Sequence, residues 1–342
     1  MKFSHVAVES LDCVLPPVEV SSDAIEARLA PAYERLSLPA GRLELMTGIR
    51  ARRFWEKPVA ASFASAEAAR KVLAKTRIPR EKLGILMHCG VCRDRMEPAT
   101  AATVHDLLGL SPATQILDVS NACLGFLNGM ILAAGLIESG QIEAALIVTG
   151  EDGLPLLERT IEQFLDPSQT RKSVKSLFAN LTIGAGAAAA VFCHTSLAPE
   201  APRLSAALCR TDSAASRLCQ GGAKNGGLEM TTDSEALLEA GIALAGNAWE
   251  GFLAETGWTR AEVTGVVCHQ VGRVHQRRLL EKLGLSEALD HPTYPFLGNT
   301  GSAALPTALA LALDGGMLAQ GGKVALLGIG SGLSTLMAAL EK

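Results

Sequence analysis

Three short segments hold the side chains best suited to chemistry in this sequence. Cys123 lies in Asn121-Ala-Cys-Leu-Gly125, after the apolar run Gln115–Val119 and at the start of an apolar pattern that predicts a buried helix. A cysteine at a helix N-terminus faces unpaired N–H groups and the positive end of the helix dipole, which stabilise its thiolate. The pattern predicts a nucleophile, although a buried structural cysteine also fits this residue taken alone.

His269 and Asn299 supply the partners that such a thiol needs. They lie in Cys268-His-Gln-Val-Gly272 and Gly298-Asn-Thr-Gly-Ser302. Taken singly, His269 also fits a core histidine and Asn299 a left-handed turn residue. With Cys123 they predict acyl transfer through an acyl-cysteine, which divides the reaction into two easier steps. Donors on His269 and Asn299 suit the enolate of a second thioester, and the same three residues also fit a hydrolytic Cys–His–Asn set.

The carbonyl oxygen that the thiolate attacks becomes an oxyanion and needs preorganised donors. The backbone N–H of Cys123 is one candidate. The glycine-rich turn Gly328-Ile-Gly-Ser-Gly332 offers further donors at Gly330, Ser331 and Gly332.

The elements that must position these groups form two similar halves. Glu81–Cys89 resembles Ala261–His269, and Ala144–Gly150 resembles Val324–Gly330, each pair about 180 positions apart. Both halves alternate strand and helix patterns, which predicts largely parallel sheets covered by helices. We therefore expect a duplicated α/β fold of five layers, α/β/α/β/α, with two mixed sheets related by a pseudo-twofold axis. The polar stretch 162–176 suggests a division into residues 1–172, which carry the cysteine, and 173–342, which carry the histidine and asparagine.

The expected elements follow from hydrophobic periodicity. The strand-like runs are Phe3–Ser10, Leu83–Cys89, Thr114–Val119, Ala144–Thr149, Ala185–Cys193, Arg203–Arg210, Gly265–His269 and Lys323–Gly328. The helical patterns are Ser22–Leu36, Ala64–Lys75, Ala99–Leu108, Leu124–Ser139, Ser234–Glu255, Gly272–Leu283 and Gly301–Gln320.

Composition excludes several classes of function. The 342 residues carry a net charge of −4, so there is no basic field for nucleic acid. No uncharged apolar run reaches the ~18 residues of a membrane span. The eight cysteines lie mostly singly, without the spacing of a disulfide scaffold, and fit a cytoplasmic protein. Cys89-Gly-Val-Cys92 has a metal-like spacing, but nothing completes a zinc site, and we expect no metal.

The motifs Asn-Ala-Cys123, His269-Gln and Gly298-Asn299, in this order, resemble those of the thiolase superfamily. The chain resembles its ketoacyl synthase III branch along nearly its full length, and Thr47-Gly-Ile-Arg50 is similar to a segment near the pantetheine entrance of that branch. The resemblance implies a thiolase-like fold, a homodimer and the catalytic set Cys123, His269 and Asn299. It implies acyl-CoA as substrate and no cofactor beyond the coenzyme A thioesters themselves.

Departures from the fatty-acid initiation enzymes narrow the resemblance. Those enzymes usually have His-Gln-Ala-Asn where this chain has His269-Gln-Val-Gly272, and Thr182–Gly186 lacks their usual acid. Glu97 stands directly before Pro98-Ala-Thr100. These variants are similar to the OleA-type enzymes, which condense two long-chain acyl-CoAs head to head. The resemblance implies that Glu97 reaches the partner subunit's site and acts as general base; a helix-start acid near the dipole is the alternative.

Arginine forks suit phosphate, so Arg50, Arg52 and Arg53 are predicted to meet the phosphates of coenzyme A, with Trp55 near the entrance. The predicted reaction is a Claisen condensation of two acyl-CoAs to a 2-alkyl-3-oxo acid, in olefin-type hydrocarbon biosynthesis, with downstream pathway enzymes as candidate partners. Three alternatives stay open. They are a ketoacyl synthase III that uses malonyl on acyl carrier protein, a cysteine-dependent thioesterase, and a non-catalytic partner subunit.

Overall fold

The main sheet divides into two halves of matching topology in the computed structural model, which describes residues 1–224 and 227–342. The first half has the order β5 (Gln115–Val119), β4 (Leu83–Cys89), β6 (Ala144–Glu151), β7 (Gly186–His194) and β1 (Val6–Val14). The second half has the order β11 (Gly265–Cys268), β12 (Lys323–Gly330), β13 (Ser334–Glu341) and β8 (Arg203–Thr211).

Strand directions relate the two halves. β4 and β6 are parallel, as are β11 and β12, while β6–β7–β1 and β12–β13–β8 are antiparallel. A single pair, Ala7 with Arg203, joins β1 to β8, so the two half-sheets form one continuous nine-stranded sheet. The predicted duplication and mixed sheets are confirmed, with this one junction between the sheets added.

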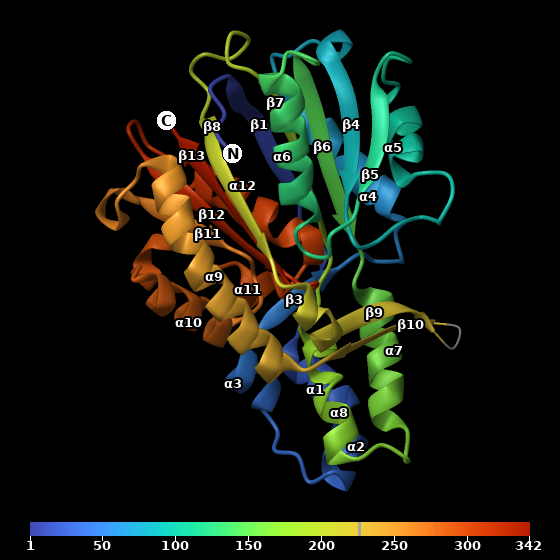
Figure 1. Ribbon diagram of the computed structural model, residues 1–342. Coiled ribbons are helices and arrows are strands. Elements are labelled where there is room, and N and C mark those ends of the chain that lie inside the picture. Colours follow the sequence, from blue (N-terminus) through green and yellow to red (C-terminus); the bar gives the residue numbers. More distant parts are fainter. Residues whose placement is uncertain (225–226) are drawn as a thin grey trace.

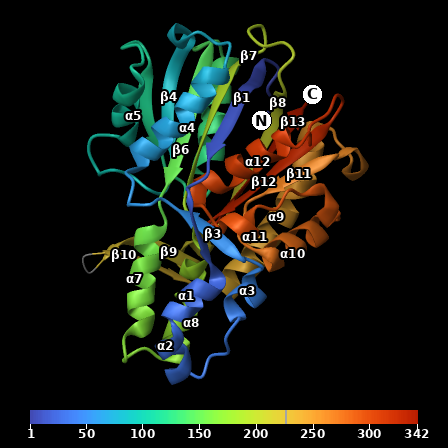
Figure 2. The same ribbon diagram turned by 180° about the vertical axis from the view of Figure 1, so that it is seen from behind.

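Helices complete the five predicted layers (Figures 1 and 2). The outer face of the first half packs against α4 (Ala61–Lys75) and α5 (Thr100–Leu108), and that of the second half against α9 (Ser234–Thr256) and α10 (Arg273–Leu283). Between the half-sheets lie α6 (Gly125–Glu138) and α12 (Ala304–Asp314), whose apolar side chains share one core with both. A helix that is apolar on all sides belongs in such an interior.

Close packing depends on small residues. Gly129 of α6 faces the side chain of Cys89 on β4, and no Cβ could fit between them. On β7, the run Ala187–Val191 is fully buried, because this strand is covered on both faces. Small side chains therefore let helices lie directly on the sheet, and they account for the alanine-rich patterns of the sequence.

The sheet does not divide at residue 172. Strand β7 follows that residue and pairs with β1 and β6 of the first half, so by topology the halves meet between His194 and Arg203. The polar stretch 162–176 instead contains the end of α7 (Leu154–Leu165) and all of α8 (Arg171–Lys175).

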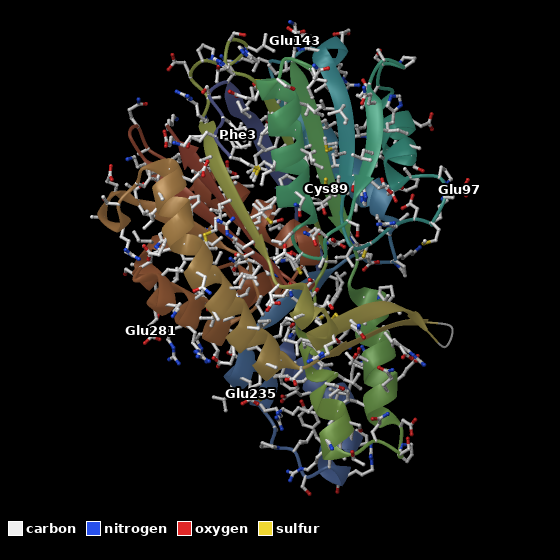
Figure 3. All side chains as sticks on the ribbon, in the orientation of Figure 1. Phe3, Cys89, Glu97, Glu143, Glu235 and Glu281 are labelled. Carbon is white, nitrogen blue, oxygen red and sulfur yellow. The ribbon has the colours of Figure 1, made fainter. Side chains whose placement is uncertain are left out.

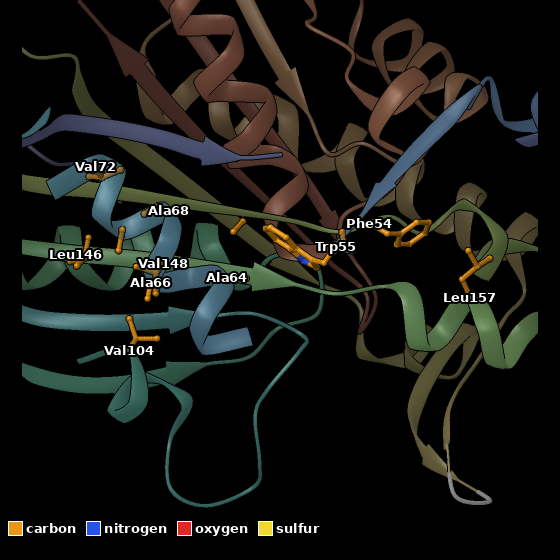
Figure 4. Packing of buried hydrophobic residues seen from close by; sticks show 14 of the residues in the cluster. Phe54, Trp55, Ala64, Ala66, Ala68, Val72, Val104, Leu146, Val148 and Leu157 are labelled. Atoms are coloured by element: carbon orange, nitrogen blue, oxygen red, sulfur yellow. The ribbon is translucent and has the colours of Figure 1, made fainter. Parts of the chain in front are cut away.

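A second lobe extends from the strand ends (Figure 1). It comprises the short helices α1 (Ser22–Arg28), α2 (Ala30–Arg35) and α3 (Arg42–Thr47), together with α7, α8 and α11 (Tyr294–Leu297). Two strand pairs complete it: β2 (Val18–Ser21) lies antiparallel to β3 (Ala51–Phe54), and β9 (Cys219–Lys224) forms a hairpin with β10 (Gly227–Thr232). The predicted helix Ser22–Leu36 is broken at Leu29, and Pro31 starts the new helix, where a missing N–H costs nothing. Figure 4 shows the core continuing from Val104 and Leu146 to Phe54 and Leu157 of this lobe.

Among the described residues, no helix is long and apolar enough to span a bilayer, and no cluster of three or more histidine, cysteine or acidic side chains could hold a metal ion. All eight cysteines are free thiols.

Candidate active site

Cys123 stands on a sharp turn between β5 and α6. The preceding residue, Ala122, has a φ of 45°, a left-handed conformation that is rare outside glycine and concentrates at functional sites. Helix α6 begins at Gly125, two residues after Cys123. The carbonyl oxygen of Ala122 accepts a hydrogen bond of 2.7 Å from Ser302 Oγ in the second half. Cys123 therefore stands on a strained turn that both halves hold.

The thiol of Cys123 is not held as a thiolate, contrary to the expectation from the helix dipole. Burial first, and then the nearby carboxyl of Glu151 and thiol of Cys219, raise the pKa of the Cys123 thiol to about 12. Desolvation outweighs the dipole because an enclosed sulfur loses the water that would solvate its charge. Attack on a thioester must therefore remove the thiol proton.

His269 follows the end of β11 and is a neutral donor. Its backbone N–H donates to Leu327 of β12 at 2.9 Å, and its side chain is buried. Burial, aided by His275, lowers the pKa of His269 to about 3, so the imidazole carries a single ring proton at neutral pH. The next residue fixes the local backbone: Gln270 Oε1 accepts from the N–H of Thr293 and Tyr294.

Asn299 is held so that its amide nitrogen is available. Its backbone donates to Thr182 O and accepts from Gly184, both at 2.9 Å. Its Oδ1 accepts from the Gly301 N–H at 3.1 Å, which leaves Nδ2 as the donor end of the side chain. The left-handed positions of this loop are Gly298 and Gly301, not Asn299. The asparagine is therefore fixed by its neighbours and does not serve as the turn residue itself.

Contacts between the two halves bring these three residues to one region. Ser302, three residues after Asn299, bonds to the turn of Cys123. Gly330 at the end of β12 packs against Leu124, because a Cβ added at Gly330 would lie 2.9 Å from Cγ of Leu124. Strand β12 also accepts the backbone hydrogen bond of His269. The predicted oxyanion donor Gly330 thus lies beside Cys123, and Ser331 and Gly332 continue the same turn, half-buried.

Glu97 does not join this group within one chain. It is exposed on the loop between β4 and α5, and Figure 3 shows it at the rim of the molecule, far from the interior position of Cys89. The neighbouring Met96 is 90% exposed.

Two of the predicted coenzyme A residues are buried and need another role. Arg52 is 0% exposed and donates to Ser22 Oγ at 3.1 Å and Leu181 O at 2.9 Å, so it cannot reach a phosphate at the entrance. Burial lowers the pKa of Arg52 to about 10. Trp55 is also buried, with Nε1 3.4 Å from the carbonyl oxygen of Glu151.

The remaining two arginines lie nearer to solvent. Arg53 is half-buried and pairs with Glu19 at 3.3 Å, whereas Arg50 is exposed and remains a prediction for phosphate binding. The sequence patterns gave no signal that Arg52 points inward, because strand β3 has only four residues and its partner β2 was not predicted.

Sequence reasoning missed Glu151, the last residue of β6. Its buried carboxylate accepts hydrogen bonds from the N–H groups of Val91, Cys92 and Ser302. It also influences the Cys123 thiol through its charge. Its place at the end of a predicted strand was the only available signal.

Two family models and several curated proteins match this chain. Residues 117–213 match the model of 3-oxoacyl-[acyl-carrier-protein] synthase III, and residues 253–342 match that of its C-terminal part. The chain is 40% identical to an acyl-CoA:acyl-CoA alkyltransferase of Shewanella oneidensis over 100% of both proteins. It is 38% identical to one of Xanthomonas campestris over 99% of both.

A solved structure is similar over its whole length. It is a cysteine-to-serine variant of OleA from Xanthomonas campestris with bound lauric acid and lauroyl-CoA, 37% identical, with a TM-score of 0.95 over 99% of this chain and 100% of that one. The chain therefore belongs to the 3-oxoacyl-[acyl-carrier-protein] synthase III family of thiolase-like acyltransferases, in the OleA-type branch of acyl-CoA:acyl-CoA alkyltransferases.

Proposed function

We propose that this protein condenses two long-chain acyl-CoA molecules head to head, without loss of carbon dioxide, and yields a 2-alkyl-3-oxo acid. The observation that carries the proposal is the pair of neutral donors, His269 and Asn299, gathered with Cys123. Two neutral donors suit an enolate oxygen, whose charge appears only during the reaction. The relatives that span the full chain bear the name acyl-CoA:acyl-CoA alkyltransferase, which supports the same substrate class.

In the first step, the sulfur of Cys123 attacks the carbonyl carbon of one acyl-CoA. As the carbon–sulfur bond forms, the thiol gives up its proton, which ends on the sulfur of the departing coenzyme A. The oxyanion is held by the N–H of Cys123 and the turn at Gly330–Gly332. Collapse of the intermediate expels coenzyme A as its thiol and leaves an acyl-cysteine.

In the second step, Glu97 of the partner subunit takes an α-proton from a second acyl-CoA. Nδ2 of Asn299 and the ring N–H of His269 hold the resulting enolate oxygen. The enolate carbon attacks the acyl-cysteine carbonyl, the carbon–sulfur bond breaks, and Cys123 is released. Hydrolysis of the remaining thioester gives the 2-alkyl-3-oxo acid and coenzyme A.

The general base requires a second copy of the chain. Strand β5 is the free edge of the sheet, and its apolar residues Ile116 and Leu117 are 42% and 43% exposed. An exposed apolar sheet edge favours pairing with another strand. The loop of Met96 and Glu97 begins at the neighbouring strand β4, so a dimer through β5 would direct this loop toward the second subunit.

Location and pathway follow from the same chemistry. Eight free thiols suit a reducing compartment, so we assign the protein to the cytoplasm. A 2-alkyl-3-oxo acid is the material for further enzymes of olefin-type hydrocarbon biosynthesis in lipid metabolism, and such enzymes are its candidate partners.

The test is a competition between two candidates for the second substrate. Purified protein would receive long-chain acyl-CoA together with malonyl-acyl carrier protein labelled in its free carboxyl group. We expect condensed product without labelled carbon dioxide. Labelled carbon dioxide would favour the decarboxylating ketoacyl synthase III, and free fatty acid alone would favour a thioesterase; either result contradicts the proposal.

A further inference from the structure

Glu151 is a buried carboxylate whose direct contacts lie on two segments that are far apart in the sequence. Its Oε1 accepts from Val91 N at 2.9 Å and from Ser302 N at 3.1 Å, and its Oε2 accepts from Cys92 N at 3.0 Å. The side chain is 4% exposed, and its backbone oxygen accepts from the indole of Trp55. One acid thus joins the loop that follows β4 to the loop that precedes α12.

The surroundings of Glu151 are built to admit this carboxylate. A Cβ added at Gly301 would lie 3.2 Å from its carboxyl carbon, and one added at Gly90 would lie 3.4 Å from Oε1. Within residues 1–224 and 227–342, its hydrogen-bond partners are all neutral groups, and no cation pairs with it. A buried charge held by backbone N–H groups and the Cys92 thiol, without a cation, costs stability, and such an arrangement persists at sites of function.

The two segments that Glu151 joins both carry groups of the second half-reaction. Ser302 belongs to the loop of Asn299, the enolate donor. Val91 and Cys92 belong to the loop that runs on to Glu97, the proposed general base. No hydrogen bond joins Glu151 to the nucleophile among the described residues, and the turn of Cys123 has its own bond from Ser302 Oγ.

We propose that Glu151 is a positioning residue for the condensation step, which clamps the loops of Asn299 and Glu97 in place through three backbone N–H groups. It acts after Cys123 has been acylated, and it is not itself a catalytic residue. The inference rests on the proposed function for the roles of those two loops.

The protonation of Glu151 reflects two opposed effects. Burial raises the pKa of the Glu151 carboxyl, while the N–H donors of Val91, Cys92 and Ser302 oppose that rise by binding the charged form. Both oxygens accept hydrogen bonds, which is the arrangement of a carboxylate. The other titratable groups nearby are the thiols of Cys92, Cys123 and Cys219, the carboxyl of Asp152 and the imidazole of His88.

The test separates the two half-reactions in Glu151→Gln. An amide has one oxygen and one NH₂ group, so it must present a donor to at least one of the three N–H groups. The matched control is Asp152→Asn, because Asp152 is also buried at this strand end but accepts from Val59 and Leu154 instead. Mass spectrometry would follow acylation of Cys123 by a long-chain acyl-CoA, and product analysis would follow condensation.

For Glu151→Gln we expect condensation to fall about tenfold or more relative to acylation of Cys123. Acylation itself should not fall by the same factor, because loss of the Glu151 charge lowers the pKa of the Cys123 thiol. For Asp152→Asn neither rate should change by more than about threefold. Condensation at the parental rate in Glu151→Gln would overturn the inference. Equal loss of acylation and condensation would also overturn it, because that pattern belongs to general damage to the fold.

Hydrogen exchange provides a second, independent readout. In the parent protein the amides of Val91, Cys92 and Ser302 should be protected, and in Glu151→Gln they should exchange about tenfold faster than in Asp152→Asn. If Glu151→Gln does not fold, rapid exchange of these three amides in the parent protein would still show that Glu151 does not hold the two loops. If the parent makes no condensed product, the proposed function fails, while the exchange data continue to decide whether Glu151 holds the loops.

Discussion

Ser302 donates its hydroxyl group to the carbonyl oxygen of Ala122 at 2.7 Å, across 180 positions of sequence. That separation equals the offset between the duplicated halves, so the bond joins positions next to the equivalent pair Cys123 and Ala303. The same serine gives its backbone N–H to Glu151. One residue of the second half thus supports the nucleophilic turn of the first.

Replacement of Ser302 by alanine should destabilise the protein by about 1–3 kcal/mol, because it leaves the Ala122 carbonyl oxygen without its partner. Urea unfolding would measure the change in the free energy of unfolding. The control is Ser62→Ala, since Ser62 Oγ is buried without a hydrogen-bond partner in the described part of the chain. A Ser302→Ala variant as stable as the control would show that the bond between the halves is unimportant.

Alkylation of Cys123 should keep accelerating with pH well above neutrality. The pKa of its thiol is raised to about 12 by burial, and only the thiolate reacts with iodoacetamide. The rate should therefore rise about tenfold for each pH unit up to pH ~10, in proportion to the thiolate fraction. Peptide mass spectrometry would isolate the signal of Cys123. A plateau near pH 7 to 8 would mean that the helix dipole does stabilise a thiolate.

Acidification should destabilise the protein through His269 and His275, two of its buried histidines. Burial lowers the pKa of His269 to about 3 and that of His275 to about 4, from an ordinary value of 6.5. Between the folded-state pKa of each histidine and its ordinary value of 6.5, the unfolded chain binds more protons than the folded one. The free energy of unfolding therefore falls as pH falls through this range. The slope is up to about 1.4 kcal/mol per pH unit for each histidine.

Urea unfolding at several pH values between about 4 and 7, the range in which the linkage acts, checks the histidine prediction. His275→Gln should flatten the dependence of the free energy of unfolding on pH relative to the parent protein. Identical pH dependence in the variant and the parent would count against a neutral, buried His275.

The sequence predicted those parts of the fold that depend on local pattern. Strand β4 begins and ends where the apolar run predicts, and α6 follows Cys123 as expected. His269 follows strand β11, as its apolar run predicts, whereas Asn299 lies in the loop between α11 and α12. Periodicity reports which side of an element is buried, and it sufficed for these elements.

The missed features depend on contacts between distant segments. Arg52 is buried by Ser22 and Leu181, which no local pattern places beside it. Glu151 gains its partners only when the two halves come together. Hairpin β9–β10 was not predicted either, because short strands of mixed composition carry little periodic signal.

Mixed dimers should show which subunit supplies the general base. Cys123→Ala and Glu97→Ala dimers should each fail to condense. A mixed dimer, purified with two different tags, has one site with an intact cysteine that faces the intact Glu97 of the partner subunit. It should therefore regain about half of the parental activity. A mixed dimer without activity would mean that Glu97 serves its own chain. A Glu97→Ala dimer that still condenses would mean that Glu97 has no catalytic role.

The most direct measurement is mass spectrometry of the products formed from one long-chain acyl-CoA as sole substrate. We predict a 2-alkyl-3-oxo acid, or the ketone left when it loses carbon dioxide. Glu97→Ala should abolish this product while Cys123 still becomes acylated. An acyl-enzyme without any condensed product, or fatty acid alone, would contradict head-to-head condensation.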